Sequence, residues 1–176
     1  MSTCTAFKGT TLLATGAQAE VALAIKNAGD LHTILAFDDE TGKVIDFNVR
    51  GTDADIAARY TPRSEARGPG RPKLGVVARE VTLLPRHWDW LAAQPGGASV
   101  VLRRLIDQER RSTKQQRRVA QEAAYKFMSA IAGDLPGFEE ATRALFADNR
   151  SRFEEQIAAW PQDIRAYATK LAQFTS

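Results

Sequence analysis

Short runs of β-branched, aromatic and leucine residues dominate the first fifty positions. Residues 5–15 combine such residues with threonines, and Gly9 among them marks a turn or a bulge. Residues 33–37 and 43–49 are two further runs, and the turn between them contains Asp and Gly. Two β-rich runs joined by such a turn are typical of a β-hairpin. The pattern therefore predicts a small antiparallel sheet.

One helix is expected to accompany this sheet. Residues 17–28 are rich in alanine and larger apolar residues, and Gly29 follows them, as at the C-terminus of many helices. After the last β-rich run, Thr52 is a suitable N-cap for a short helix that reaches about Tyr60. The first sixty residues thus predict a sheet-plus-helix unit.

The second half of the chain shows helical spacing of apolar residues almost throughout. From Ser99, a candidate N-cap, this spacing extends to Ala132, either as one long helix or as two helices with a break near Ser112. A shorter helix is expected before it and three after it, over residues 86–94, 138–147, 150–159 and 161–174. Residues 76–84 are β-rich, and Pro85 ends that run.

Composition changes at residues 61–75, which hold three prolines and three glycines. Such a stretch cannot continue a helix or a strand, so it predicts a linker and the main domain boundary. The expected class is α+β: a small antiparallel sheet with one helix, a basic linker, and a mostly helical C-terminal half. The predicted domains are 1–60 (sheet plus helix), 61–75 (linker), 76–111 (strand, helix, helix) and 112–176 (helices).

Charge is concentrated in the centre of the chain. The whole sequence has 24 basic and 21 acidic side chains, but residues 61–118 alone hold 13 basic and 5 acidic ones, and both flanks are net acidic. Binding to a phosphate backbone depends on such local concentrations of Lys and Arg. The alternative interpretation is a solvated helical face that the acidic flanks balance.

Candidate catalytic chemistry is sparse. Two histidines exclude a multi-histidine metal site, and no glycine-rich phosphate-binding motif or Gly-x-Ser-x-Gly motif occurs. Cys4 has no basic neighbour before Lys8, which gives a nucleophilic role weak support. The carboxylates of residues 38–40 are candidates for a hard cation, but solvated carboxylates are commoner in a hairpin turn. We therefore expect a protein that is not an enzyme and has no metal or cofactor.

The expected cellular location also rests on features that the sequence lacks. The single cysteine allows no internal disulfide, and no apolar run approaches the roughly 20 residues of a membrane-spanning helix. The first residues lack a basic segment followed by an apolar one, so no signal peptide is expected. The sequence predicts a cytoplasmic protein with no membrane partner.

Residues 76–111 resemble a ribbon-helix-helix module. The matching segments, in chain order, are Arg79–Pro85, Trp88–Gln94, Gly97-Ala98-Ser99 and Val101–Ile106. The resemblance implies a homodimer whose two strands pair and enter the DNA major groove. Neither face of the expected strand is a clean row of polar residues, and Glu80 would repel phosphates unless it accepted a hydrogen bond from cytosine. The alternative is a helical hairpin packed on the C-terminal helices, with Trp88 and Trp90 as core and rim.

The linker string Gly70-Arg71-Pro72-Lys73 resembles the core of an AT-hook. That motif lays an extended basic segment along the narrow minor groove of A·T DNA. The Arg that precedes the glycine in the full motif is replaced by Pro69, and Arg67 is the nearest substitute. The alternative is a plain basic linker.

The whole chain also resembles DUF2239, a bacterial family of unknown function. The resemblance rests on three segments, Gly70–Trp88, Ala132–Glu139 and Trp160–Arg165. It implies no activity, and it suggests that the three segments belong to one unit.

Together these patterns favour a non-enzymatic DNA-binding homodimer, a class that includes transcriptional regulators. The helix start near Ser99 adds free backbone N–H groups as an anion site. The residues expected to contact DNA are Arg67, Arg71, Lys73, Arg79, Thr82, Arg86, Gly97, Ser99, Arg103 and Arg104. The alternative is a protein-interaction module whose basic face docks an acidic partner.

Overall fold

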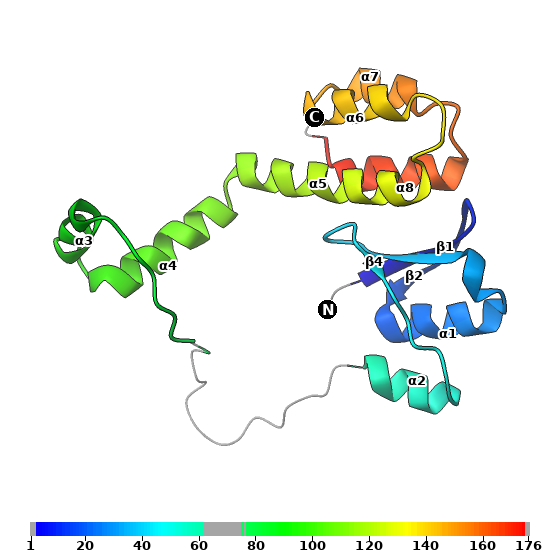
Figure 1. Cartoon of the computed structure of the whole chain (residues 1–176), viewed down its shortest axis with the longest axis horizontal. Coiled ribbons are helices and arrows are strands. Elements are labelled where there is room, and N and C mark those ends of the chain that lie inside the picture. Colours follow the sequence, from blue (N-terminus) through cyan, green and yellow to red (C-terminus); the bar gives the residue numbers. More distant parts are fainter. Residues whose placement is uncertain (1–2, 62–74, 76, 175–176) are drawn as a thin grey trace. The chain divides into compact units, whose positions relative to one another are not determined.

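A computed structural model describes residues 3–61, 75 and 77–174 (Figure 1). The chain divides into two compact units, one formed by residues 1–62 together with 116–176, and the other by residues 63–115. Most of the predicted linker, and with it Arg67, Arg71 and Lys73, lies outside the described residues.

The first unit contains the predicted antiparallel sheet. Its strands are β1 (Thr3–Lys8), β2 (Thr11–Ala17), β3 (Ile34–Asp38) and β4 (Val44–Ile45), in the spatial order β2-β1-β3-β4. Gly9 lies in the turn between β1 and β2 with a φ of 57°, a value that suits glycine. The hairpin predicted over residues 33–49 is confirmed, and the turn or bulge expected at Gly9 is the turn of a second hairpin, β1–β2; the sheet and the helices make the predicted α+β fold.

Helices cover both faces of this sheet (Figure 1). On one face α1 (Gln18–Ala28) packs Val21 and Ile25 against Cys4, Ala6 and Ala36. The side chains of β1 alternate between the two faces, so Phe7 is available to the opposite layer. The short helices η1 (Leu31–Thr33) and α2 (Asp53–Tyr60) complete this half, and Thr52 caps α2 as predicted, because its side chain accepts a hydrogen bond from Asp55 N–H.

The opposite face is covered by helices from the far end of the chain. Helices α5 (Thr113–Ile131) and α8 (Gln162–Ala172) lie next to the sheet, and α6 (Phe138–Phe146) and α7 (Arg150–Gln156) pack on the side of α5 and α8 that faces away from it (Figure 1). Phe127 of α5 is fully buried and its ring centroid lies 5.5 Å from Phe7, 4.9 Å from Phe37 and 4.7 Å from Tyr167. Residues 1–60 and 112–176, which the sequence suggested as separate domains, therefore share one hydrophobic core.

The turn between β3 and β4 lies directly on α5. A Cβ atom at Gly42 would stand 2.0 Å from the carbonyl oxygen of Ala123, and the φ of Gly42 is 65°. Only glycine fits both the close approach and this backbone conformation. The hairpin and the helix are thus held in contact at the level of the main chain.

The second unit is a pair of helices, α3 (Pro85–Ala92) and α4 (Gly97–Arg110). The predicted break near Ser112 is present, and the Ser112 hydroxyl accepts a hydrogen bond from Gln115 N–H in the first turn of α5. Residues 77–84 form no strand, although the sequence predicted one. A strand needs a hydrogen-bonding partner, and no other described segment of this chain supplies one to these residues.

Helix α4 begins earlier than the sequence indicated. Ser99 was expected as the N-cap, but the helix starts at Gly97 and its N-cap is Gly96, with a φ of 90°. Gly96 and Gly97 have φ values of 90° and 73°, a left-handed conformation that glycine adopts without strain. Ser99 is instead the third residue of the helix.

Candidate nucleic-acid interface

Helix α4 has two chemically different faces. At 100° per residue, Val101, Leu102, Leu105 and Ile106 form one apolar stripe. The opposite side carries a polar face, defined here as Arg103, Arg104, Asp107, Gln108 and Arg111, which together with Val100 line a shallow, open depression. The spacing of i, i+4 and i+8 brings these side chains to one surface.

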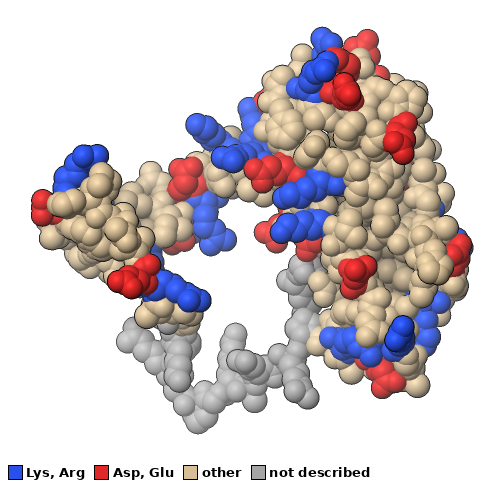
Figure 2. Space-filling model, viewed as in Figure 1, with Lys and Arg blue, Asp and Glu red and all other residues tan. Residues whose placement is uncertain are grey.

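The charged side chains of this unit have no ionic partners within the described chain. Residues 77–115 contain seven basic and four acidic side chains. The nine ion pairs between described residues all lie outside this stretch. In Figure 2 the α3–α4 part is a largely uncharged surface that carries small groups of basic and acidic atoms, some of them next to one another. The guanidinium groups are therefore available to an external anion.

The unit also exposes most of its large apolar side chains. Only Leu91 and Val101 are buried among the large apolar residues of 77–115. The tryptophans that the alternative interpretation placed in a core and its rim are 40 % (Trp88) and 50 % (Trp90) exposed. The other exposed ones are Val77, Val81, Leu84, Val100, Leu105 and Ile106. An apolar surface of this kind commonly marks an interaction site.

The structure gathers the predicted DNA-contacting residues only in part. Arg103 and Arg104 share the polar face of α4. Gly97 and Ser99 are exposed in the first turn of α4, and Arg79, Thr82 and Arg86 are exposed before and at the start of α3, but none of these five lines the polar face. Asp107, Gln108 and Arg111 were not predicted, although helical spacing from Arg103 and Arg104 would have found them.

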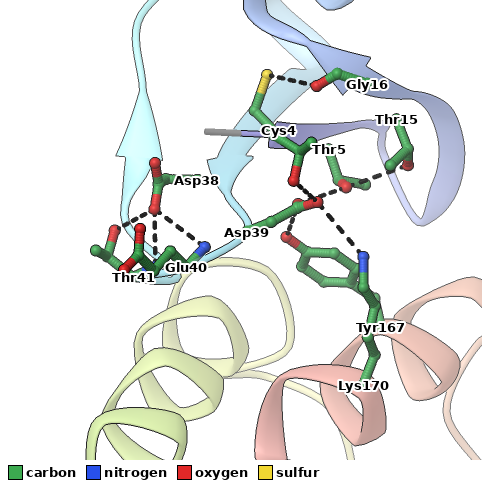
Figure 3. A network of polar contacts seen from close by, with 11 residues as sticks. Cys4, Thr5, Thr15, Gly16, Asp38, Asp39, Glu40, Thr41, Tyr167 and Lys170 are labelled. Carbon is green, nitrogen blue, oxygen red and sulfur yellow. Dashed lines mark hydrogen bonds and ion pairs between the residues drawn. The ribbon is translucent and has the colours of Figure 1, made fainter. Parts of the chain in front are cut away.

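A second polar cluster, also not predicted, lies in the first unit (Figure 3). The carboxylate of Asp39, in the β3–β4 turn, accepts hydrogen bonds from the hydroxyls of Thr5 (2.7 Å), Tyr167 (2.7 Å) and Thr3 (2.9 Å). The ammonium group of Lys170 lies 3.4 Å away. The Asp39 side chain is only 11 % exposed, so the carboxylate is held by the protein rather than by water.

These contacts determine the ionisation of the cluster. Burial alone would raise the pKa of Asp39, but the hydrogen bonds from Tyr167, Thr5 and Thr3 and the charge of Lys170 outweigh it and lower the pKa. Burial and the bond to Asp39 raise the pKa of Tyr167 far above its ordinary value. Asp39 thus accepts several hydrogen bonds as an anion and Tyr167 donates one of them, an arrangement that joins β1, the turn and α8.

Cys4 lies beside this cluster, and its thiol has low reactivity. Its side chain is fully buried, and the thiol donates to the carbonyl of Gly16 at 3.8 Å. Burial, followed by the charges of Asp39 and Asp38, raises the pKa of Cys4 to about 11. The thiolate that a nucleophile requires is therefore scarce.

The described residues contain no group of three or more His, Cys, Asp or Glu side chains that could hold a metal ion. Within the same residues, no helix is both long and apolar enough to cross a membrane.

A family model described as "Uncharacterized protein conserved in bacteria (DUF2239)" matches residues 3–172 of this chain, which is nearly its whole length. Neither the curated proteins nor the solved structures include one that matches it.

Proposed function

The chain belongs to the bacterial DUF2239 family, and we propose that it is a cytoplasmic, non-enzymatic protein that binds duplex DNA as a homodimer through residues 77–111. The observation that carries the proposal is the unpaired charge of this stretch. Its basic side chains are exposed and form no ion pair with a described residue.

Unpaired arginines favour an anionic polymer for a simple energetic reason. A guanidinium that already holds a carboxylate must lose that bond before it contacts a phosphate, whereas Arg103 and Arg104 lose none. Arginine also presents a planar set of donors that matches phosphate oxygens. Arg79, which precedes α3, and Arg86, in its first turn, are also exposed and basic.

Dimerisation accounts for the exposed apolar residues. A helix pair with two buried large side chains has too small a core to be stable alone. The partner that suits an uncharged, apolar stripe is another apolar stripe, and a second copy of the chain provides one. In a dimer, residues 79–84 would also gain the backbone partner that a single chain does not give them.

The main test is binding to a duplex as a function of salt. If about five phosphates are neutralised, log affinity falls against log salt with a slope of about −4 to −5. The double variant Arg103→Ala/Arg104→Ala should flatten the slope by roughly two units. The matched control is Arg150→Ala/Arg152→Ala, which removes the same charge from arginines paired with Glu154 and Glu140, and should leave the slope unchanged.

Absence of binding to any duplex at low salt would refute the proposal. It would then favour an acidic protein as the partner of the basic face. A series of duplex lengths adds a second criterion, because only a DNA-binding site gives a defined minimum length. Arg71→Ala/Lys73→Ala should weaken binding to A·T-rich duplex more than to G·C-rich duplex if the linker follows the minor groove.

Sedimentation tests the dimer separately. The protein should sediment as a dimer at high micromolar concentration, and Trp88→Ala should shift it toward monomer because large aromatic side chains dominate interface energies. Only monomer in the unaltered protein would contradict the homodimer.

A further inference from the structure

The polar face of α4 does not consist of basic residues alone. It combines three arginines with the carboxylate of Asp107 and the amide of Gln108. A carboxylate among arginines weakens attraction to phosphates, so phosphate binding alone does not explain Asp107. Arg, Gln and Asp are, however, the side chains that pair with guanine, adenine and cytosine edges in the major groove. We infer that this face of α4, and not residues 79–84, enters the major groove, where Asp107 and Gln108 read base edges while Arg103 and Arg104 contact the adjacent phosphates; the inference rests on the proposed DNA binding.

The dimensions of the helix agree with this role. From Arg103 to Arg111 the helix rises about 12 Å, which corresponds to three or four base pairs. An α-helix fits the major groove, which is about 12 Å wide. The apolar stripe with Leu105 lies on the opposite side, so the helix can enter the groove without burying the surface proposed for dimerisation.

The side chains of this face are free to make these contacts. Arg103, Arg104, Asp107, Gln108 and Arg111 are exposed, and their side chains form no hydrogen bond or ion pair with a described residue. A bidentate contact therefore needs no rearrangement of the protein. By contrast, residues 79–84 offer Thr82, Arg79 and Glu80 on a segment that is not a strand in this chain.

The experiment selects preferred sequences from a randomised duplex library and then compares the selected duplex with a scrambled one. The unaltered protein should prefer the selected duplex. Gln108→Ala should lower this preference by about 5- to 100-fold, the loss expected for one bidentate contact, with little change on the scrambled duplex. Asp107→Asn should lower the preference as well, while it raises affinity for the scrambled duplex because a negative charge is removed.

Thr82→Ala tests the ribbon alternative, in which this substitution abolishes the preference for the selected duplex. The inference fails if Thr82→Ala abolishes the preference and Gln108→Ala does not, or if selection returns no preferred sequence although duplexes are bound. Neither result touches the proposed function, which fails only if no duplex is bound. Circular dichroism of each variant checks folding, and all three side chains are exposed.

Discussion

The two units of this protein differ in where they place apolar and charged side chains. In the unit formed by residues 1–62 and 116–176, rings such as Phe7, Phe37 and Phe127 are fully buried, and most cations face a carboxylate or a carbonyl. In residues 77–115 the apolar side chains are exposed and the charges are unpaired. The first unit thus buries its apolar side chains and pairs most of its cations, whereas the described residues of the second unit do neither.

This difference concerns function as much as stability. Of the 14 large apolar residues that are exposed in the described chain, eight lie in residues 77–115. Exposed ion pairs contribute little to folding, so their absence from this stretch costs little stability. Their absence does leave donors free, and free donors and uncovered apolar side chains are what a binding surface needs. The comparison therefore predicts that substitutions in the first unit mainly lower stability, whereas substitutions in residues 77–115 mainly lower binding.

The largest expected effect is at Phe127. Phe127→Ala should lower the free energy of unfolding by about 3 to 5 kcal/mol, because a fully buried ring in contact with three others leaves a cavity. Urea denaturation measures the change. The matched control, Trp88→Ala in the second unit, should change the unfolding free energy of the monomer by less than about 1 kcal/mol.

Hydrogen exchange shows whether this core is shared. Phe127→Ala should reduce protection in β1 and β3 as well as in α5 and α8. Strands that stay protected while the helices exchange would mean that the sheet and the C-terminal helices are separate domains.

The next effect is at Asp39. Asp39→Ala should lower the free energy of unfolding by about 2 to 3 kcal/mol, since it leaves the buried Tyr167 hydroxyl without its acceptor. Tyr167→Phe removes the same bond without leaving an orphaned carboxylate, because Thr5 and Thr3 still donate to Asp39. It should therefore cost less than Asp39→Ala, and an equal or larger loss would contradict the central role of the carboxylate.

Acid provides an independent measurement of the same cluster. The pKa of Asp39 is lowered in the folded protein, so its ionised form stabilises the fold above the pKa of about 3.9 that an aspartate has in an unfolded chain. This contribution disappears as the pH falls through the lower, folded-state pKa. Stability of the unaltered protein should drop below about pH 4, and the drop should be smaller in Asp39→Asn, as followed by thermal unfolding at several pH values.

A smaller effect is expected at Arg143. This arginine pairs with both Glu139 and Glu140 on the surface of α6. Arg143→Ala should cost about 0.5 kcal/mol, and the cost should shrink in high salt, because exposed pairs are weak and screened. A loss above 1 kcal/mol, or one that salt leaves unchanged, would mean that these ion pairs stabilise the fold more than exposed pairs usually do.

The smallest effect on stability is expected on the polar face of α4. Arg103→Ala/Arg104→Ala should leave the unfolding free energy within about 0.5 kcal/mol, since neither guanidinium has an ionic partner to lose. The same variant carries the largest predicted effect on DNA binding. A clear loss of stability would show that these arginines serve the fold.

Local pattern was sufficient to predict most elements of the fold. Turn residues indicated the hairpin over residues 33–49, and the cap at Thr52 and the helix break near Ser112 depend on a few neighbouring residues. The strand expected at 79–84 failed because β-propensity describes the residue, whereas a strand requires a partner. That residues 79–84 form a strand by pairing in a homodimer stays a prediction.

The shared core and the Asp39 cluster were beyond this kind of analysis. Asp39 stands in a turn, where a carboxylate is usually solvated, and nothing near it in the sequence indicates a contact with Tyr167, 128 residues later. The basic segment of the candidate interface was visible as local charge. The polar face of α4 was not visible in this way, because whether a residue lies on that face depends on its position around the helix as well as on its type.

The separation of the two halves of the core has a consequence for how the chain is made. The strands leave the ribosome first, but the aromatic rings and the Tyr167 hydroxyl that cover them arrive only with α5 and α8. At about 5 to 20 residues per second, the 128 residues from Asp39 to Tyr167 take on the order of 10 s to synthesise. During that interval Phe7 and Phe37 lack the helices that bury them in the folded protein, so we expect the nascent chain to be most prone to aggregation at this stage.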